Sequence, residues 1–350
     1  MPGAARKTMR VARWYNNRDV RLETMPVPEI GPGELLVRVE ACGICGSDVM
    51  EWYRRDRGPL VLGHEIGGQV AAVGEGVTGY RVGERITAAH HVPCNTCHYC
   101  LGGHHTACET LRKTSFDPGG LAEYLRLPAI NVDRGVFPLP DGVSYEDATF
   151  VEPLACVWRG QRQAGMGPGK SVLVIGSGIA GLLHVMLARS LGAGRVIATD
   201  TSDYRRQAAR KFGAEVTFSA DEDVPARLRQ VNGGYLADLV ILCTGAAPAL
   251  SQALASVERG GTVLLFAPTG PGVTVPLSVN DLFWRNDVTL TTSYAGSPAD
   301  YRTALQIVRA GTLPLADMVT HRLGLAETGR GFQMVAGAGE SLKVIIAPQR

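Results

Sequence analysis

The sequence predicts a two-domain α/β protein, in which an antiparallel, barrel-like domain precedes a doubly wound domain with a parallel sheet. Short β-type runs separated by glycine occupy about the first 150 residues. From residue 171 onward, apolar runs alternate with helical segments, and a glycine-rich turn opens this second region. We expect residues 1–153 and 295–350 to form the first domain and residues 154–294 to form the second.

Three runs carry the β signal of the first domain. Each alternates apolar and polar positions and is bounded by glycine or proline, which is typical of antiparallel strands. The runs are GELLVRVEA (33–41), EIGGQVAAVGEGV (65–77) and VGERITAA (82–89). A helix-like segment (298–311) and an apolar strand (341–348) follow much later, and we expect this tail to return to the first domain.

The second domain shows six apolar strands with helical segments between them. Continuous apolar strands indicate a parallel sheet that is buried on both faces, and six of them fit a complete Rossmann-type nucleotide-binding domain. The strands are expected at 171–176, 194–200, 214–218, 237–245, 260–267 and 287–293, with helices at 179–192 and 202–213.

Composition excludes several classes of protein. The chain is 45% hydrophobic and 19% charged, so it has enough apolar material for packed cores. The net charge is +2 without a dense basic run, which gives no indication of a nucleic-acid partner. No apolar run approaches the roughly 18 residues that span a bilayer.

The N-terminal region MPGAARKTMRVARWY lacks the hydrophobic core of a secretory signal. We expect residues 1–8 to be an appendage or the result of upstream initiation, and the protein to be cytoplasmic. Thiols stay reduced in that compartment, so the eight cysteines are interpreted as metal ligands or buried thiols before disulfides.

Four cysteines in the segment 90–110 have the spacing C-x₂-C-x₂-C-x₇-C, namely Cys94, Cys97, Cys100 and Cys108. This spacing predicts a closed, tetrahedral zinc site that is structural rather than catalytic. A disulfide pair and a nucleic-acid-binding zinc ribbon are the alternatives, which the compartment and the lack of basic clustering disfavour. Five histidines crowd the same segment, and we interpret them as bystanders: His90, His91, His98, His104 and His105.

The glycine-rich turn predicts a dinucleotide site. Its first glycine permits the tight turn, the second lets the backbone approach a pyrophosphate, and the third lets helix and strand pack closely. The turn consists of Gly176, Ser177, Gly178, Ile179, Ala180 and Gly181. Asp200 ends the next strand, nineteen residues past Gly181, where a carboxylate binds ribose hydroxyls and repels a 2′-phosphate. The sequence therefore favours NAD over NADP, and we place Arg205 and Thr244 at the same cofactor site.

A second metal site is indicated by Cys45 and His64, with either Glu65 or Glu152 as a third ligand. A catalytic zinc keeps one coordination position open, so three protein ligands of these atom types suffice. Taken alone, each of these residues is more often part of ordinary core packing than a metal ligand.

In combination, the motifs resemble those of the zinc-containing medium-chain alcohol and polyol dehydrogenases, nearly from end to end. The matching segments are CGICGSD (42–48), GHE (63–65), the four-cysteine lobe, GGLAEY (119–124), EPLAC (152–156) and GSGIAG (176–181). The resemblance implies a GroES-like catalytic domain beside the Rossmann domain, with the catalytic cleft between them. It also implies zinc-dependent oxidation of an alcohol by NAD, with one catalytic and one structural zinc in each subunit.

The resemblance further implies roles for single residues. Cys45, His64 and Glu65 match zinc ligands, and Glu152 matches an acid that binds the metal or holds its water. Asp48 matches a carboxylate that orients the zinc-bound histidine, and Ser47 matches the hydroxyl that takes the alcohol proton. Many members have a histidine three residues after this serine where the chain has Met50, so the end of the proton relay is left open.

The sequence therefore predicts an enzyme that oxidises a secondary alcohol to a ketone, with a polyol, cyclitol, sugar or hydroxy amino acid as substrate. One alternative is an NADPH-dependent reductase of aldehydes or enones. The other is a non-catalytic scaffold that binds zinc and NAD. The resemblance suggests a homodimer or homotetramer in which late strands of the nucleotide domain pair between subunits.

Overall fold

The computed structural model describes residues 7–54 and 57–350. Most of the N-terminal segment interpreted as an appendage, residues 1–6, lies outside them. Thr8 instead begins the first strand and pairs with Pro26, so the fold starts before the proposed end of the appendage. The chain divides into two compact units, residues 1–155 with 295–350 and residues 156–294.

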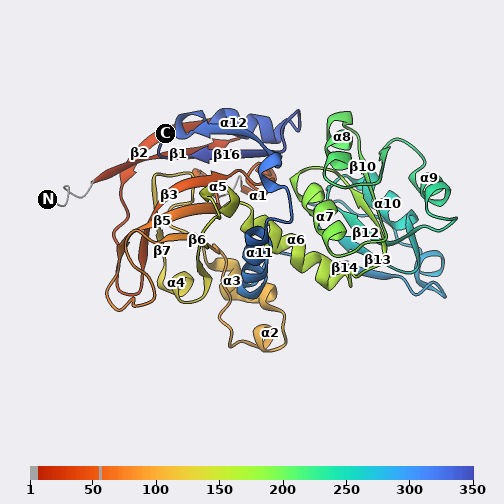
Figure 1. Cartoon of the computed structure of the whole chain (residues 1–350), viewed down its shortest axis with the longest axis horizontal. Coiled ribbons are helices and arrows are strands. Elements are labelled where there is room, and N and C mark those ends of the chain that lie inside the picture. The colour runs from red at the N-terminus through yellow and green to blue at the C-terminus, as the bar shows by residue number, and fades with distance from the viewer. Residues whose placement is uncertain (1–6, 55–56) are drawn as a thin grey trace. The chain divides into compact units, whose positions relative to one another are not determined.

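The first unit is built on two sheets that are largely antiparallel (Figure 1). The smaller sheet has the order β2-β1-β4, and the larger has the order β15-β16-β3-β5-β6-β8, with β7 also paired to β3. The strands of the first unit are β1 (Thr8–Asn16), β2 (Asp19–Pro26), β3 (Leu35–Gly43), β4 (Leu60–Val61), β5 (Glu65–Val73), β6 (Arg85–Ala88), β7 (Tyr124–Leu127), β8 (Val136–Pro138), β15 (Val319–Gly324) and β16 (Lys343–Ala347).

Short helices connect these strands. They are α1 (Glu51–Arg54), α2 (His98–Leu101), η2 (His105–Ala107), α3 (Glu109–Lys113), α4 (Ala129–Gly135) and α5 (Tyr145–Ala148). Helix α6 (Val151–Gln163) starts in the first unit and ends in the second. In Figure 1, α2 lies at the tip of a lobe that projects from the sheets of the first unit.

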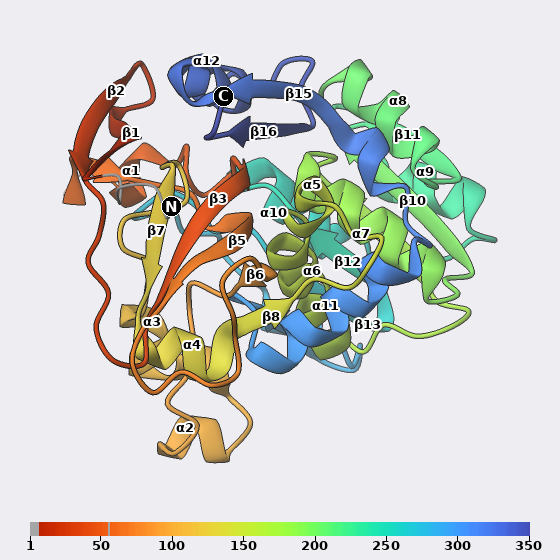
Figure 2. The same cartoon turned by 60° about the vertical axis from the view of Figure 1, so that its left-hand side comes forward.

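The C-terminal tail belongs to the first unit. It contains α11 (Pro298–Ala310), η4 (Leu315–Met318), η5 (Leu325–Glu327) and α12 (Thr328–Ala336) in addition to β15 and β16. A capping box between Ser297 and Asp300 starts α11, and Gly311 in a left-handed conformation ends it. Strand β16 pairs with β3, and α12 lies against β15 and β16 (Figure 2). Sequence analysis did not predict β15 or α12.

The second unit has one parallel sheet of six strands in the order β11-β10-β9-β12-β13-β14. This order confirms the predicted doubly wound fold, in which the strand order reverses beside the first strand, β9 (Ser171–Ile175). The strands are β9 (Ser171–Ile175), β10 (Arg195–Asp200), β11 (Val216–Ser219), β12 (Ala237–Leu242), β13 (Val257–Leu265) and β14 (Thr289–Thr292). The helices are α7 (Ile179–Ser190), α8 (Asp203–Lys211), α9 (Val224–Val231), α10 (Ala247–Ala255) and η3 (Val279–Phe283).

Each unit has its own hydrophobic core. In the first, the inward residues of β3 and β5 meet Trp14 and Phe332. In the second, β9 lies in the interior of the sheet. It is fully buried, because helices cover both faces of the sheet. Among the residues that the structure describes, no helix combines the length and apolarity needed to cross a membrane.

Candidate active site

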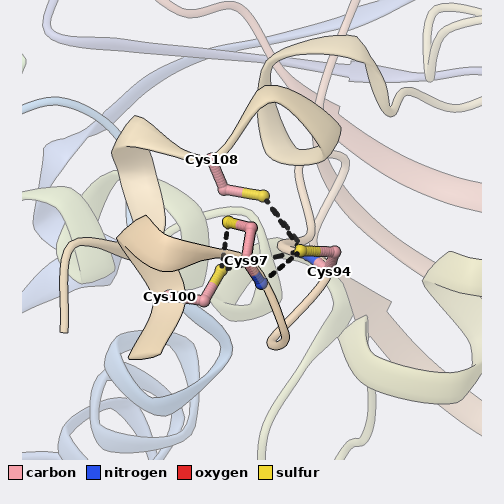
Figure 3. A group of neighbouring side chains, drawn as sticks. All are labelled: Cys94, Cys97, Cys100 and Cys108. Carbon is pink, nitrogen blue, oxygen red and sulfur yellow. Dashed lines mark hydrogen bonds between the residues drawn. The ribbon is translucent and has the colours of Figure 1, made fainter. Parts of the chain in front are cut away.

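The four predicted cysteine ligands converge in the projecting lobe (Figure 3). The Sγ–Sγ distances are 3.6 Å for Cys97–Cys100 and Cys94–Cys108, and 4.0 Å for Cys94–Cys100. Zinc–sulfur bonds of about 2.3 Å place the sulfurs of a tetrahedral site about 3.8 Å apart. The arrangement therefore fits one zinc ion held by four thiolates.

Backbone amides prepare this cluster for thiolates. Hydrogen bonds, chiefly from Thr96, lower the pKa of Cys94 to about 5. Burial raises the pKa of Cys108, but hydrogen bonds from the backbone of Cys94 and Leu111 outweigh it, so the net shift is downward. Burial, followed by Cys97, raises the pKa of Cys100 to about 12, which a bound cation would reverse.

The second group of potential ligands lies where β3 ends and β5 begins. The ligand atoms of Cys45, His64 and Glu65 all lie within 4.8 Å of one another. Cys45 stands in the turn after β3, whereas His64 and Glu65 lie at the start of β5, which pairs with β3. Strand pairing therefore brings together the CGICGSD and GHE motifs, which are separated in the sequence.

Asp48 contacts two members of this group, Cys45 and His64. Its carboxylate is fully buried, accepts a hydrogen bond from the Cys45 amide at 3.0 Å and lies 3.4 Å from Nδ1 of His64. With Nδ1 turned to Asp48, the other ring nitrogen is available for a metal. Burial lowers the pKa of His64, but the charge of Asp48 and hydrogen bonds to Asp48 and Cys45 outweigh it and raise the pKa well above its usual value.

Glu65 forms a buried ion pair with Lys343 from β16. Both side chains are essentially inaccessible to solvent, with exposed fractions of 1% and 0%. The Lys343 ammonium also lies 3.3 Å from the Thr149 carbonyl oxygen and 5.0 Å from the centre of the Phe150 ring. A side chain at Gly43 would collide with both members of the pair and would have to displace them.

Glu152 belongs to a different group from Cys45. Its ligand atom lies within 4.8 Å of those of His64 and His90, at the start of α6. The potential ligands thus form two groups that share His64. Cys45 and Glu65 complete one group, and His90 and Glu152 complete the other.

Ser47 directs its hydroxyl towards the thiol of Cys45, with Oγ and Sγ 3.4 Å apart. The Ser47 amide also points at this sulfur, at 3.4 Å. The serine predicted to take the alcohol proton therefore lies beside a potential metal ligand.

The glycine turn of the second unit has the geometry that its sequence predicts. Gly176 has a φ of +90°, and a side chain at Gly181 would collide with the carbonyl oxygen of Gly176. Ile179 and Ala180 open α7 with Gly178 as the N-cap, so the first amides of the helix are available to a phosphate.

Asp200 lies next to this turn. Its two oxygens accept hydrogen bonds from the amides of Ser177 and Ser202, each at 2.8 Å. Arg205, in the first turn of α8, reaches towards Gly178, and Thr244 follows β12 beside Gly176. The predicted cofactor residues are therefore neighbours at the carboxyl ends of β9, β10 and β12, where doubly wound sheets bind nucleotides.

Comparison with known proteins decides the family. The family model described as "Alcohol dehydrogenase GroES-like domain" matches residues 31–141, and that described as "Zinc-binding dehydrogenase" matches residues 180–310. The sorbitol dehydrogenase of Gallus gallus is 32% identical over 339 residues, which cover 94% of this chain and 93% of that protein. The chain belongs to the zinc-dependent medium-chain polyol dehydrogenase family.

Two further relatives agree with this assignment. The D-xylulose reductase A of Aspergillus niger is 31% identical, with 94% of this chain and 93% of that protein covered. A protein from Sinorhizobium meliloti 1021, described as a zinc-binding dehydrogenase bound to NADP, is 30% identical with a TM-score of 0.88, and 98% of this chain and all of that chain are covered. The dehydrogenase is thus an oxidoreductase that acts on CH–OH groups with zinc and NAD(P), and its GroES-like and Rossmann domains confirm the predicted fold class.

Two residues in contact with the predicted ligands are not among the residues predicted from the sequence. Lys343 was read as part of an apolar strand, although a lysine inside SLKVIIAP is itself a signal of a buried partner. His90 was treated as a bystander of the cysteine lobe, whereas the structure places its ring 4.6 Å from that of His64. The pKa of His90 lies well below its usual value, mainly because the ring is buried.

Replacing Cys97 with serine should remove zinc from the lobe and destabilise the protein, because ligand binding at a structural site contributes folding free energy. We expect the zinc content per chain to fall by one ion and the melting temperature to drop, measured by metal analysis and calorimetry. The matched control is His104→Ala, a change in the same lobe outside the four-cysteine group, which should alter neither. Unchanged melting of Cys97→Ser with one zinc fewer would contradict a structural role.

Replacing Lys343 with methionine should leave the Glu65 carboxylate buried without its counter-charge and cost about 3–5 kcal/mol of unfolding free energy. The double variant Lys343→Met/Glu65→Gln should recover most of this loss, measured by urea denaturation. Arg322→Met is the control, because it removes an exposed ion pair with Glu146 and should cost less than about 1 kcal/mol. Additive losses in the double variant would show that the two residues are not coupled.

Proposed function

We propose that this dehydrogenase oxidises a secondary alcohol of a polyol, cyclitol, sugar or hydroxy amino acid to the ketone, with NAD as hydride acceptor. One observation carries the proposal: Cys45, His64 and Glu65 form a buried group of soft and hard ligands next to Ser47. The sorbitol dehydrogenase and D-xylulose reductase names of its relatives support the polyol class.

In this proposal, Cys45 and His64 hold the catalytic zinc together with Glu65 or Glu152, and Cys94, Cys97, Cys100 and Cys108 hold the structural zinc. The residues fit the metal, because one thiolate, one imidazole and a carboxylate are the donors of open zinc sites. When bound there, zinc supplies Lewis-acid polarisation of the alcohol oxygen.

The protein's own residues prepare the reaction. Asp48 fixes the orientation of the His64 ring, and Lys343 balances the charge of the buried Glu65 carboxylate. Ser47 holds a hydroxyl at the thiol of Cys45, from where Oγ can receive the proton of the alcohol. A bound nicotinamide would supply the hydride acceptor, and the protein contributes position and electrostatics.

The preference for NAD rests on Asp200. Its carboxylate is anchored by two amides beside the glycine turn, where it disfavours a 2′-phosphate. The alternative is an NADPH-dependent reductase of aldehydes or enones. Arg205 favours it, because this arginine lies near the same turn with a buried Nε that has no hydrogen-bond partner in the structure. A non-catalytic scaffold would bind the cofactor without turnover.

Purified enzyme should reduce NAD with at least one member of a panel of polyols, cyclitols, sugars, 3-hydroxy amino acids and simple secondary alcohols. We expect kcat/KM to be higher with NAD than with NADP, followed through NADH absorbance. Cys45→Ala is the matched variant and should lose turnover while still binding NAD. Turnover only in the direction of reduction with NADPH would favour the reductase, and cofactor binding with silence across the panel would favour the scaffold.

We also propose that the protein forms a homodimer or homotetramer through the free edge of the six-stranded sheet. The outermost strand β14 is largely exposed, as are Val279 and Trp284 nearby, with exposed fractions of 66% and 67%. An unpaired edge offers backbone groups to a second copy, and exposed apolar residues add area to such an interface.

Light scattering on the wild type should therefore give a dimer or tetramer mass, and Val279→Asp with Trp284→Asp should reduce it. Leu101→Asp, which also replaces an exposed apolar residue but in the cysteine lobe, should leave the mass unchanged. A monomeric wild type at micromolar concentration would refute the proposed assembly.

A cytoplasmic location is likewise proposed. All eight cysteines are free thiols in the structure, and four of them gather as potential zinc ligands. Such a ligand set requires a compartment that keeps thiols reduced.

A further inference from the structure

His90 is a polar residue beside the active site to which neither the family motifs nor the zinc chemistry gives a role. It follows β6 by two residues and precedes the cysteine lobe. Its ring lies between those of His64 and His91, with centroid distances of 4.6 Å and 3.9 Å, and its edge faces Phe116. These contacts fix the plane of the ring.

One ring nitrogen of His90 makes no hydrogen bond with the described residues. Its Nδ1 atom is buried and has no hydrogen-bond partner among the described residues. The neighbouring His91 differs, because its Nδ1 lies 2.7 Å from the Thr114 carbonyl oxygen. A buried polar atom without a partner costs free energy, so its presence next to an active site indicates that a bound molecule supplies the partner.

The position of His90 argues against a role as zinc ligand. Cys45, His64 and Glu65 form one compact group, and His90 is not part of it although it shares His64 with Glu152. A metal that Cys45, His64 and Glu65 hold together therefore does not include His90 among its ligands. The ligand atom of His90 instead lies within 4.8 Å of those of His64 and Glu152.

We propose that His90 determines substrate specificity by a hydrogen bond to the hydroxyl next to the one that is oxidised. An imidazole nitrogen can donate or accept, so it suits a hydroxyl in either tautomer. The enzyme thereby selects vicinal diols and polyols over alcohols with a single hydroxyl. This inference rests on the proposed function, because it concerns the substrate of the same site.

The test compares 2,3-butanediol with 2-butanol, which has the same carbon skeleton without the neighbouring hydroxyl. His90→Phe should lower kcat/KM for the diol about tenfold, mainly through KM, and change it little for 2-butanol. His90→Gln, which keeps an amide donor and acceptor, should retain part of the preference for the diol. Zinc content and the dissociation constant of NADH should stay at the wild-type values in both variants.

His91→Phe is the matched control, because this histidine stacks on His90 but its nitrogen is already bonded to Thr114. It should leave the ratio of the two kcat/KM values unchanged. Equal losses for both substrates in His90→Phe, an unchanged ratio, or a loss of zinc would overturn the assignment of His90. A wild type that turns over other members of the panel but neither of these two alcohols would overturn the His90 assignment alone, whereas silence across the whole panel would refute the proposed function.

Discussion

The buried ion pair between Lys343 and Glu65 is the interaction on which the active site depends. It joins β16, the last strand of the chain, to the first residue of β5. Both strands lie beside β3, whose end leads into Cys45, so the pair fixes the corner of the sheet that carries the ligands. Because a buried charge without its partner is strongly unfavourable, the stability of this corner depends on the C-terminal strand.

The two candidate metal sites differ in physical design. In the lobe, four sulfurs within one short segment would surround a metal, and backbone amides would stabilise their charge, which is the design of a closed site that supports folding. At the ends of β3 and β5, the potential ligands come from separate segments, and Asp48 and Lys343 contact them.

What the sequence could predict depended on how local each signal is. The four cysteines and the glycine turn are set by spacing over a few residues, so their sites could be expected before the fold was known. Lys343 and Glu65 are separated by 278 positions, and only the sheet order β16-β3-β5 brings them together. His90 was assigned to the lobe because it lies four residues before Cys94, whereas the turn after β6 directs its ring to His64. The role of Asp48 followed from family resemblance, since a buried carboxylate in a turn has no distinctive local pattern.

We propose that chemistry takes place at the Cys45–His64 site while the cysteine lobe supports the structure. Gradual dialysis against a chelator separates the two roles when zinc content, turnover and melting temperature are measured on the same samples. Turnover should disappear with loss of the first zinc per chain while melting stays nearly unchanged, and added zinc should restore it. Full turnover at one zinc per chain, or loss of turnover only together with unfolding, would refute this division of roles.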